Sequence, residues 1–226
     1  MRRDVFECDQ PLRLNGPAGV LEVAISAAKP AGVMAAMRAV AVVCHPHPLH
    51  GGNMDNKVVS TLMRAYRDLG VAVVRFNFRG VGGSGGDYAE GVGEVDDLLA
   101  VVAEVHRLRP AAPLFLAGFS FGAAVIANAC AGVKPVKHLM LVAPPVPRYA
   151  LGDIKTMAMP VSILQGGLDE QVVAADVARW ADALEGVVGY REFATTGHFF
   201  HGALGPLKQA VTDIITGLKV VGLSNG

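Results

Sequence analysis

The chain has 226 residues, of which 52% are hydrophobic, and its 20 basic and 20 acidic residues are scattered along the sequence. That length predicts one domain over residues 1–226, and the balanced charge excludes a basic surface for nucleic acid. The best candidate for a membrane span, GVMAAMRAVAVVC, is interrupted by Arg38 and is too short to cross a bilayer, so we expect no membrane partner.

The first ten residues, MRRDVFECDQ, carry charges where a secretory signal has its apolar region. Three cysteines (Cys8, Cys44 and Cys130) lack C-x-x-C spacing, and so they predict neither a disulfide framework nor a zinc site. We therefore expect the protein in the reducing cytoplasm.

Residues 1–26 alternate loosely between apolar and polar side chains around a turn signal, which predicts antiparallel strands. Further along, short apolar runs alternate with segments of helical periodicity. The predicted strands are 39–45, 71–78, 113–118, 136–143, 160–166 and 189–197, and the predicted helices are 57–70, 94–109, the segment after Ser120, 172–186 and 206–218. Because parallel strands need helical crossovers, this order predicts an α/β fold with a mostly parallel sheet and helices on both faces.

One serine lies between two phenylalanines in Gly118-Phe119-Ser120-Phe121-Gly122, where a predicted strand gives way to a predicted helix. Reactive groups gather at the carboxyl edge of a parallel sheet, and a helix that starts there directs its free N–H groups and positive end toward the serine. The flanking glycines let strand and helix approach closely around a sharp turn. Gly and Ser are common enough for the pattern to arise by chance, but its position predicts that Ser120 is a nucleophile.

A general base for Ser120 is predicted in ATTGHFFHG, after the last strand. His198 lies where a loop can turn its imidazole toward the serine. His201 competes for the role, and we prefer His198 because it comes first after the strand. His106 and His138 lie within or beside regular elements, a position typical of structural histidines.

The acid is predicted in LQGGLDEQVV, directly after another strand. Asp169 reaches the same sheet edge there, and a buried carboxylate would hold the histidine tautomer and stabilise the imidazolium. The competing interpretation is a charge at a helix N-terminus, a function that Glu170 could serve alone, while Asp153 and Asp176 are less well placed. Nucleophile, acid and base thus follow three different strands in the order Ser, Asp, His.

Backbone donors for an oxyanion are predicted in CHPHPLHGGNMDN, which follows the strand ending near Cys44. Pro46 and Pro48 have no N–H, so within the tetrapeptide HPHP only His45 and His47 can donate. We expect the N–H of His47 to pair with that of Phe121, the residue after the nucleophile. The histidines of this loop lack the fixed spacing of a metal site, and we expect no metal.

A glycine-rich segment at residues 80–85 satisfies the dinucleotide pattern G-x-G-x-x-G. A nucleotide site would also need a helix that opens at the glycines and an acidic residue at the end of the next strand, and the sequence predicts neither. We expect a structural loop beside the active site, anchored by Arg79, and no cofactor.

Together these segments resemble the α/β-hydrolase superfamily, through HPHPLHGG, RFNFRGVGGSGG, GFSFG at the nucleophile, GGLDEQV at the acid and GHFF at the base. Within it the chain is similar to small hydrolases without a cap that are related to dienelactone hydrolase. The resemblance covers nearly the whole chain and implies an α/β-hydrolase fold with an eight-stranded central sheet and serine chemistry on esters. Dienelactone hydrolases have a cysteine in place of Ser120, so their substrate is not carried over, and HPHP replaces the lipase-type H-G-G-G.

The segment APPVPRYALGDIKTMAM is too short for a lid domain, which predicts an open site. Apolar residues near the predicted site indicate a small acyl pocket, while core positions are the alternative for several of them. The residues expected there are Phe119, Phe121, Pro144, Pro145, Val146, Phe199 and Phe200.

The function expected from the sequence is that of a carboxylesterase-like serine hydrolase, acting on small-molecule esters through an acyl-enzyme on Ser120. Thioesterases, peptidases and acyltransferases can use the same residues, and a binding or scaffold protein could keep the fold without activity. The physiological substrate, the oligomeric state and the roles of His45, His50 and His201 are left open.

Overall fold

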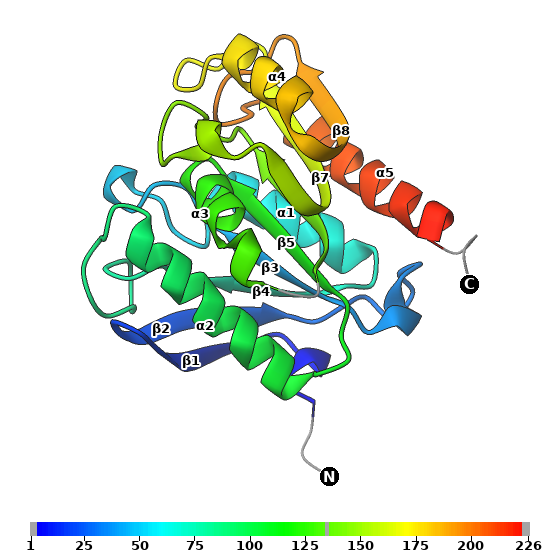
Figure 1. The fold of residues 1–226 in the computed structure, drawn as a ribbon. Helices are drawn as coiled ribbons and strands as arrows, with labels where there is room; N and C mark the ends of the chain where they lie inside the picture. The colour runs from blue at the N-terminus through cyan, green and yellow to red at the C-terminus, as the bar shows by residue number, and fades with distance from the viewer. Residues whose placement is uncertain (1–3, 134–135, 223–226) are drawn as a thin grey trace.

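The structure, a computed structural model, describes residues 4–133 and 136–222. An eight-stranded sheet runs through the molecule in the order β1-β2-β4-β3-β5-β6-β7-β8 (Figure 1). The strands are β1 (Gln10–Gly16), β2 (Gly19–Ser26), β3 (Val40–Cys44), β4 (Ala72–Phe76), β5 (Leu114–Phe119), β6 (Val136–Val142), β7 (Thr156–Gly166) and β8 (Glu185–Phe193). The main helices are α1 (Lys57–Asp68), α2 (Val92–Leu108), α3 (Phe121–Ala129), α4 (Ala174–Ala183) and α5 (Leu204–Gly222).

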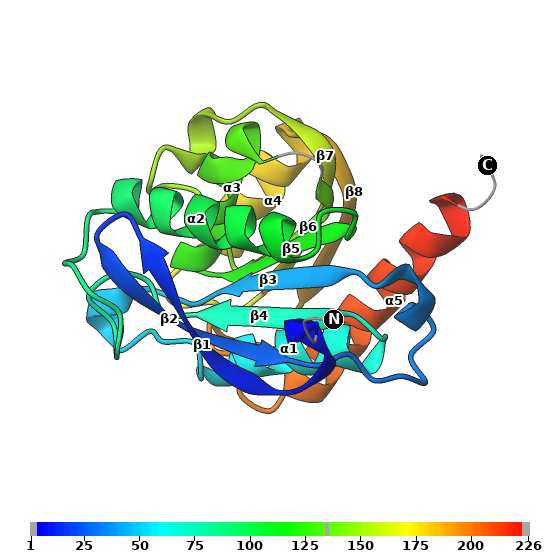
Figure 2. The same ribbon diagram turned by 90° about the horizontal axis from the view of Figure 1, so that it is seen from below.

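The sheet combines an antiparallel edge with a parallel body. β1 pairs antiparallel with β2 and β2 with β4, whereas every pairing from β4–β3 through to β7–β8 is parallel. Figure 2 shows α2, α3 and α4 on one face of the sheet and α1 and α5 on the other. The predicted fold class, including the antiparallel opening, is confirmed. Within the two described ranges, no helix has both the length and the apolar character needed to cross a bilayer.

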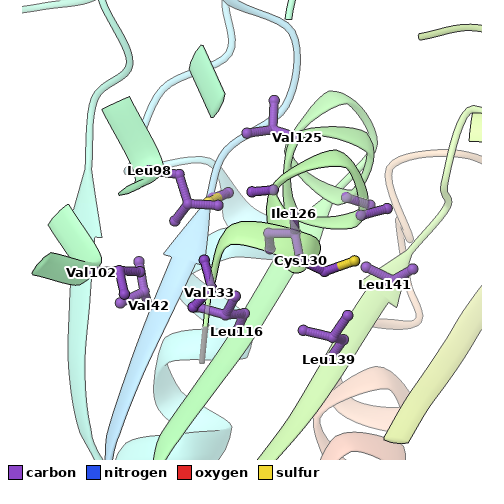
Figure 3. Close-up of a cluster of buried hydrophobic side chains, with 14 of the residues drawn as sticks. Val42, Leu98, Val102, Leu116, Val125, Ile126, Cys130, Val133, Leu139 and Leu141 are labelled. Carbon is purple, nitrogen blue, oxygen red and sulfur yellow. The ribbon is translucent and has the colours of Figure 1, made fainter. Parts of the chain in front are cut away.

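Both faces of the sheet are packed, which explains why its central strands are apolar throughout. All five residues of β3 are buried. Side chains alternate along a strand, so Val40 and Val42 pack toward α2 and α3, while Ala41 and Val43 pack toward α1 and α5. Figure 3 shows part of the first cluster, where the aliphatic side chains of two helices and three strands interlock. The first cluster packs α3 against the middle of the sheet.

The predicted helix 172–186 is wrong beyond Ala183. Glu185 instead begins β8, and its N–H donates to the Lys155 carbonyl at 2.9 Å. Gly186 adopts φ +101°, a value incompatible with a continuing helix. This extra pairing also lengthens the neighbouring strand, so β7 begins at Thr156 rather than at residue 160.

The glycine-rich loop at residues 80–85 is filled by the protein itself. Glu22 Oε2 accepts hydrogen bonds from the Gly83 N–H and from Asn77 Nδ2, both at 2.7 Å. The Ser84 hydroxyl donates to the Asn77 carbonyl at 2.6 Å, and the Gly85 N–H donates to the Val20 carbonyl at 2.8 Å. A carboxylate of the chain thus occupies amides that would face a phosphate in a nucleotide site.

Arg79 anchors this loop to α2, as the sequence predicted. Its Nε and Nη2 donate to the two carboxylate oxygens of Asp97, at 3.0 and 2.8 Å, and its backbone N–H donates to Asp97 Oδ2 at 3.0 Å. The side chain of Asp97 is fully buried and that of Arg79 is 11% exposed. The bidentate pair raises the pKa of Arg79 and fixes the loop that follows β4.

Asp97→Asn should lower the free energy of unfolding by about 3 kcal/mol, because it leaves a largely buried guanidinium without its counter-charge. Glu104→Gln is the matched control, since Glu104 pairs with the exposed Arg107 at the surface of the same helix, and it should change stability little. Urea unfolding of the three proteins, with equal slopes required, measures both effects. Equal losses in the two variants would contradict the role given to the buried pair.

Candidate active site

Ser120 lies in a strained turn between β5 and α3. Its backbone has φ +53° and ψ −118°, an unfavourable region for a residue with a β-carbon. The Ser120 N–H donates to the Val142 carbonyl at 2.8 Å, and its own carbonyl accepts the first helical bond, from Ala123 at 2.9 Å. These bonds hold the turn at the carboxyl edge of the sheet.

Gly118 and Gly122 are required by close contacts around this turn. A β-carbon on Gly118 would lie 2.5 Å from the carbonyl carbon of Gly122, and one on Gly122 would lie 2.5 Å from the Cys44 carbonyl oxygen. Real β-carbons essentially never come this close to backbone atoms. The two glycines therefore allow α3 to start directly against β5 and the end of β3, as predicted from the G-x-S-x-G pattern.

The structure brings the three predicted residues into one hydrogen-bonded line. His198 Nε2 lies 3.1 Å from Ser120 Oγ, and His198 Nδ1 lies 2.8 Å from Asp169 Oδ2. The three residues come from the turns after β5, β7 and β8. The side chains of His198 and Asp169 are 2% and 0% exposed, so water competes little for their hydrogen bond.

The partners of His198 determine its tautomer. An ionised carboxylate can only accept, so the proton resides on Nδ1, which faces Asp169, and the lone pair of Nε2 faces the Ser120 hydroxyl. In this state the imidazole can take a proton from Ser120 Oγ.

Asp169 accepts four hydrogen bonds. Its Oδ1 accepts from the N–H groups of Gln171 and Val172 at 2.9 and 2.8 Å, and its Oδ2 accepts from His198 and, at 3.1 Å, from Gln165 Nε2. Burial by itself would raise the pKa of this carboxyl, but the hydrogen bonds and the nearby imidazole hold the pKa below its usual value. The carboxylate is therefore ionised at neutral pH.

The sequence did not predict the hydrogen bonds that Gln165 and Glu170 make to this line. Gln165, fully buried near the end of β7, fixes Asp169 through its amide; a glutamine at the end of an otherwise apolar strand was the available signal. Glu170 does not sit at a helix N-terminus, since α4 begins at Ala174, and its Oε2 instead accepts from the His198 backbone N–H at 3.1 Å.

The remaining candidates for acid and base lie elsewhere. Asp176 forms an ion pair with Arg179 on α4, and Asp153 is exposed after β6. His138 is buried on β6, with Nε2 2.9 Å from the Ser162 hydroxyl. His201 lines a separate hollow of about 550 Å³, which adjoins the site through Asn56 and Phe199.

His45 shapes the loop after β3 from inside the protein. Its Nε2 accepts from the Phe78 N–H at 3.1 Å, so Nδ1 carries the proton and donates to the Pro46 carbonyl at 2.6 Å. Burial lowers the pKa of His45 to about 4, which keeps the ring neutral. This histidine therefore holds the loop in place and does not face the site.

The backbone N–H groups of His47 and Phe121 make no hydrogen bond within residues 4–133 and 136–222. His47 lines the same cavity as Ser120, and Phe121 begins α3, whose positive end lies at the turn. The His47 ring is engaged separately, with Nδ1 accepting from the Leu49 N–H at 3.2 Å and Nε2 3.2 Å from the Tyr88 hydroxyl. Both amides thus remain available to a ligand at Ser120.

The cavity around Ser120 is polar, and the predicted apolar acyl pocket is wrong in most of its residues. Of the seven residues predicted, only Phe199 lines the cavity. Phe119 and Phe200 are buried in the core, and Pro144 and Pro145 are also buried. Val146 packs against the core, and Phe121 packs against Tyr149. The cavity has a volume of about 470 Å³. Its lining comprises Pro46, His47, His50, Gly51, Gly52, Asn56, Ser120, Arg148, Glu170, Gln171, His198 and Phe199.

Asp169→Asn should destabilise the protein most at neutral pH. Because the pKa of Asp169 is lowered on folding, its ionised form contributes stability that is fully present above the unfolded pKa of about 3.9 and is lost as the pH falls through the folded value. The difference in unfolding free energy between wild type and variant should therefore shrink from pH 6 to pH 3. Urea titrations at both pH values measure it, and a pH-independent difference would show that the charge of Asp169 does not stabilise the fold.

The chain is similar in sequence and in fold to several known proteins. Residues 36–151 match the family model described as serine aminopeptidase, S33. An alpha-beta serine hydrolase homologue from Coxiella burnetii is 40% identical, with a TM-score of 0.84 over 91% of this chain and 97% of that one. XC6422 from Xanthomonas campestris, described as an a/b serine hydrolase without lid, is also 40% identical, with a TM-score of 0.84 over 91% and 93% of the two chains. The uncharacterized protein RP471 of Rickettsia prowazekii is 33% identical, over 89% of this chain and 86% of its own length.

Proposed function

Because this chain belongs to the α/β serine hydrolase family, we propose that it is a carboxylesterase-like enzyme that cleaves small acyl esters through an acyl-enzyme on Ser120. The hydrogen-bonded line from Ser120 Oγ through the His198 imidazole to Asp169 is the observation that carries the proposal. Such a line activates a hydroxyl that is unreactive on its own.

The first half-reaction forms the acyl-enzyme. Ser120 Oγ attacks the ester carbonyl carbon as His198 Nε2 takes its proton, and Asp169 stabilises the resulting imidazolium. The carbonyl oxygen becomes an oxyanion that accepts hydrogen bonds from the N–H groups of His47 and Phe121. When the tetrahedral intermediate collapses, the alcohol leaves with the proton from His198.

The second half-reaction frees the enzyme. Water attacks the acyl carbon while His198 takes one of its protons, and the same two amides stabilise the second oxyanion. Collapse returns the proton to Ser120 Oγ and releases the carboxylic acid. Asp169 stays ionised throughout, in keeping with its lowered pKa.

The short connection between β6 and β7 supports small esters as substrates. Residues 143–155 contain a single turn of 3-10 helix at Leu151–Asp153 and leave the mouth of the cavity uncovered. A volume of about 470 Å³ suits a small molecule. This connection contains no lid that could close over a long acyl chain bound in the cavity.

Ser120→Ala should lower kcat on 4-nitrophenyl acetate by about 10⁶-fold and Asp169→Asn by about 10⁴-fold, as in other enzymes with this arrangement. A fluorophosphonate should form an adduct on Ser120 of the folded wild type. Ser60→Ala, on α1, is the control and should leave both readouts unchanged. Full activity of Ser120→Ala would overturn the mechanism, and a folded wild type without adduct or turnover would favour a non-catalytic binding protein.

His47→Pro tests the backbone donor, because φ at this position is −52° and suits proline. The substitution removes both the ring and the N–H, whereas His47→Ala removes the ring alone. We expect kcat of His47→Pro to fall about 10²- to 10³-fold below that of His47→Ala. Equal kcat values in the two variants would exclude this amide from the oxyanion site.

A further inference from the structure

One wall of the cavity at Ser120 carries two imidazoles and a guanidinium whose side chains the proposed reaction does not use. His47 and His50 stack with ring centroids 4.4 Å apart, and Arg148 lines the same cavity. Burial, and to a smaller extent the charges of His50 and Arg148, lower the pKa of His47. Glu170 also lines the cavity, and its Oε2 accepts a hydrogen bond from the His198 N–H at 3.1 Å.

Arg148 has no partner for its guanidinium within the described ranges. No hydrogen bond or ion pair joins its side chain to another residue there. Arg75 and Arg79 are paired with Asp55 and Asp97, whereas the unpaired Arg148 lines the cavity that holds Ser120. A guanidinium offers a planar set of N–H donors that matches a carboxylate, and at Arg148 these donors are free.

The backbone holds Arg148 at this position. Its N–H donates to the Pro145 carbonyl at 2.9 Å, and its carbonyl accepts from Leu151 at 3.2 Å. Asn128 Nδ2, on α3, donates to the Tyr149 carbonyl at 2.9 Å. Tyr149 has φ +56° and the next residue +55°, so the chain bends sharply just after the arginine. Strain of this kind persists where surrounding contacts enforce it, and here it presents a charged side chain to the mouth of the site.

We propose that the substrate is an ester that carries a carboxylate, and that Arg148 binds this carboxylate while the ester carbonyl lies at Ser120. This inference rests on the proposed esterase function and adds the substrate class. The polar lining, the unpaired guanidinium and the small cavity all favour a short charged substrate over an aliphatic ester. His50 contributes an imidazole to the same wall.

Two matched pairs of esters test the charge on either side of the scissile bond. Monoethyl succinate and ethyl levulinate share the acyl chain and differ in a carboxylate against a methyl ketone, and ethanol release is measured. Acetoxyacetate and 2-acetoxyacetamide differ in the alcohol portion, and acetate release is measured. In at least one pair, wild type should show a kcat/KM about tenfold higher for the charged ester at low ionic strength, and added salt should reduce the preference.

Substitutions then assign the preference. Arg148→Met, which keeps the length of the chain and removes the charge, should bring the kcat/KM ratio to about one, and Arg148→Lys should retain part of it. Arg179→Met is the matched control, since Arg179 is exposed on α4 and paired with Asp176, and it should leave the ratio unchanged. The rate of fluorophosphonate labelling at Ser120 checks that each variant keeps an intact site.

The outcomes separate this inference from the proposed function. Wild type that labels at Ser120 and hydrolyses 4-nitrophenyl acetate, yet prefers neither charged ester, overturns the carboxylate inference and leaves the esterase. A preference that survives in Arg148→Met also overturns it. Absence of both labelling and hydrolysis in folded wild type overturns the esterase, and the carboxylate inference with it.

Discussion

The contact between the first turn of α3 and the end of β3 is the constraint from which the candidate site follows. Gly122 lies so close to the carbonyls of Cys44 and His45 that only a hydrogen fits between them. The chain that continues from His45 carries the His47 amide, and the helix that begins at Phe121 carries the other free amide. One steric contact therefore sets the distance between Ser120 and the two amides that we propose as oxyanion donors. The strained backbone of Ser120 follows from this packing.

Buried charged groups in this molecule have hydrogen-bond partners within the protein, whereas one charged group at the cavity mouth has none among the residues described. The fully buried carboxylates are each surrounded by donors: Glu94 accepts from the N–H groups of Ala89 and Gly91, Asp97 accepts from Arg79, and Asp169 accepts four hydrogen bonds. Burial without such partners would drive a carboxyl toward its neutral form. At the mouth of the cavity, by contrast, the Arg148 side chain forms no ion pair or hydrogen bond with another described residue. The buried carboxylates thus have their charges compensated within the fold, and an uncompensated guanidinium lies at the cavity that holds Ser120.

Much of the fold, and the grouping of Ser120, His198 and Asp169, could be predicted because both follow from the local pattern of apolar and polar residues. Alternating apolar runs and helical segments predict a parallel sheet, and the carboxyl ends of parallel strands share one edge, so Ser120, Asp169 and His198 were expected together. The predicted boundaries were wrong around α4 and β8, where pairing with β7 draws Glu185 out of the expected helix and β8 ends at Phe193 rather than at residue 197. Such competition between a helix end and a strand partner depends on a segment nearly thirty residues away, and a local pattern does not contain it.

The side-chain environment was less predictable than the positions of the three residues. Seven apolar neighbours suggested an acyl pocket, but a residue next to the nucleophile in sequence can point into the core, as Phe119 does. The contacts of Gln165 and Glu170 likewise depend on how loops from separate strands meet. The sequence therefore predicted which three residues lie together better than it predicted the side chains that line the cavity around them.

The amino-terminal hairpin, formed by β1 and β2, stabilises the glycine-rich loop through the Glu22 carboxylate. It supplies an internal anion to Gly83 and Asn77, while Ser84 and Gly85 bond back to the same hairpin. A chain shortened by those two strands would lose a counterpart for several backbone amides and would also bare one side of β4. Deleting β1 and β2 would thus leave the Gly83 amide without its carboxylate and expose an edge of β4 that could pair with another chain. The hairpin is therefore part of the smallest unit that can fold without aggregating.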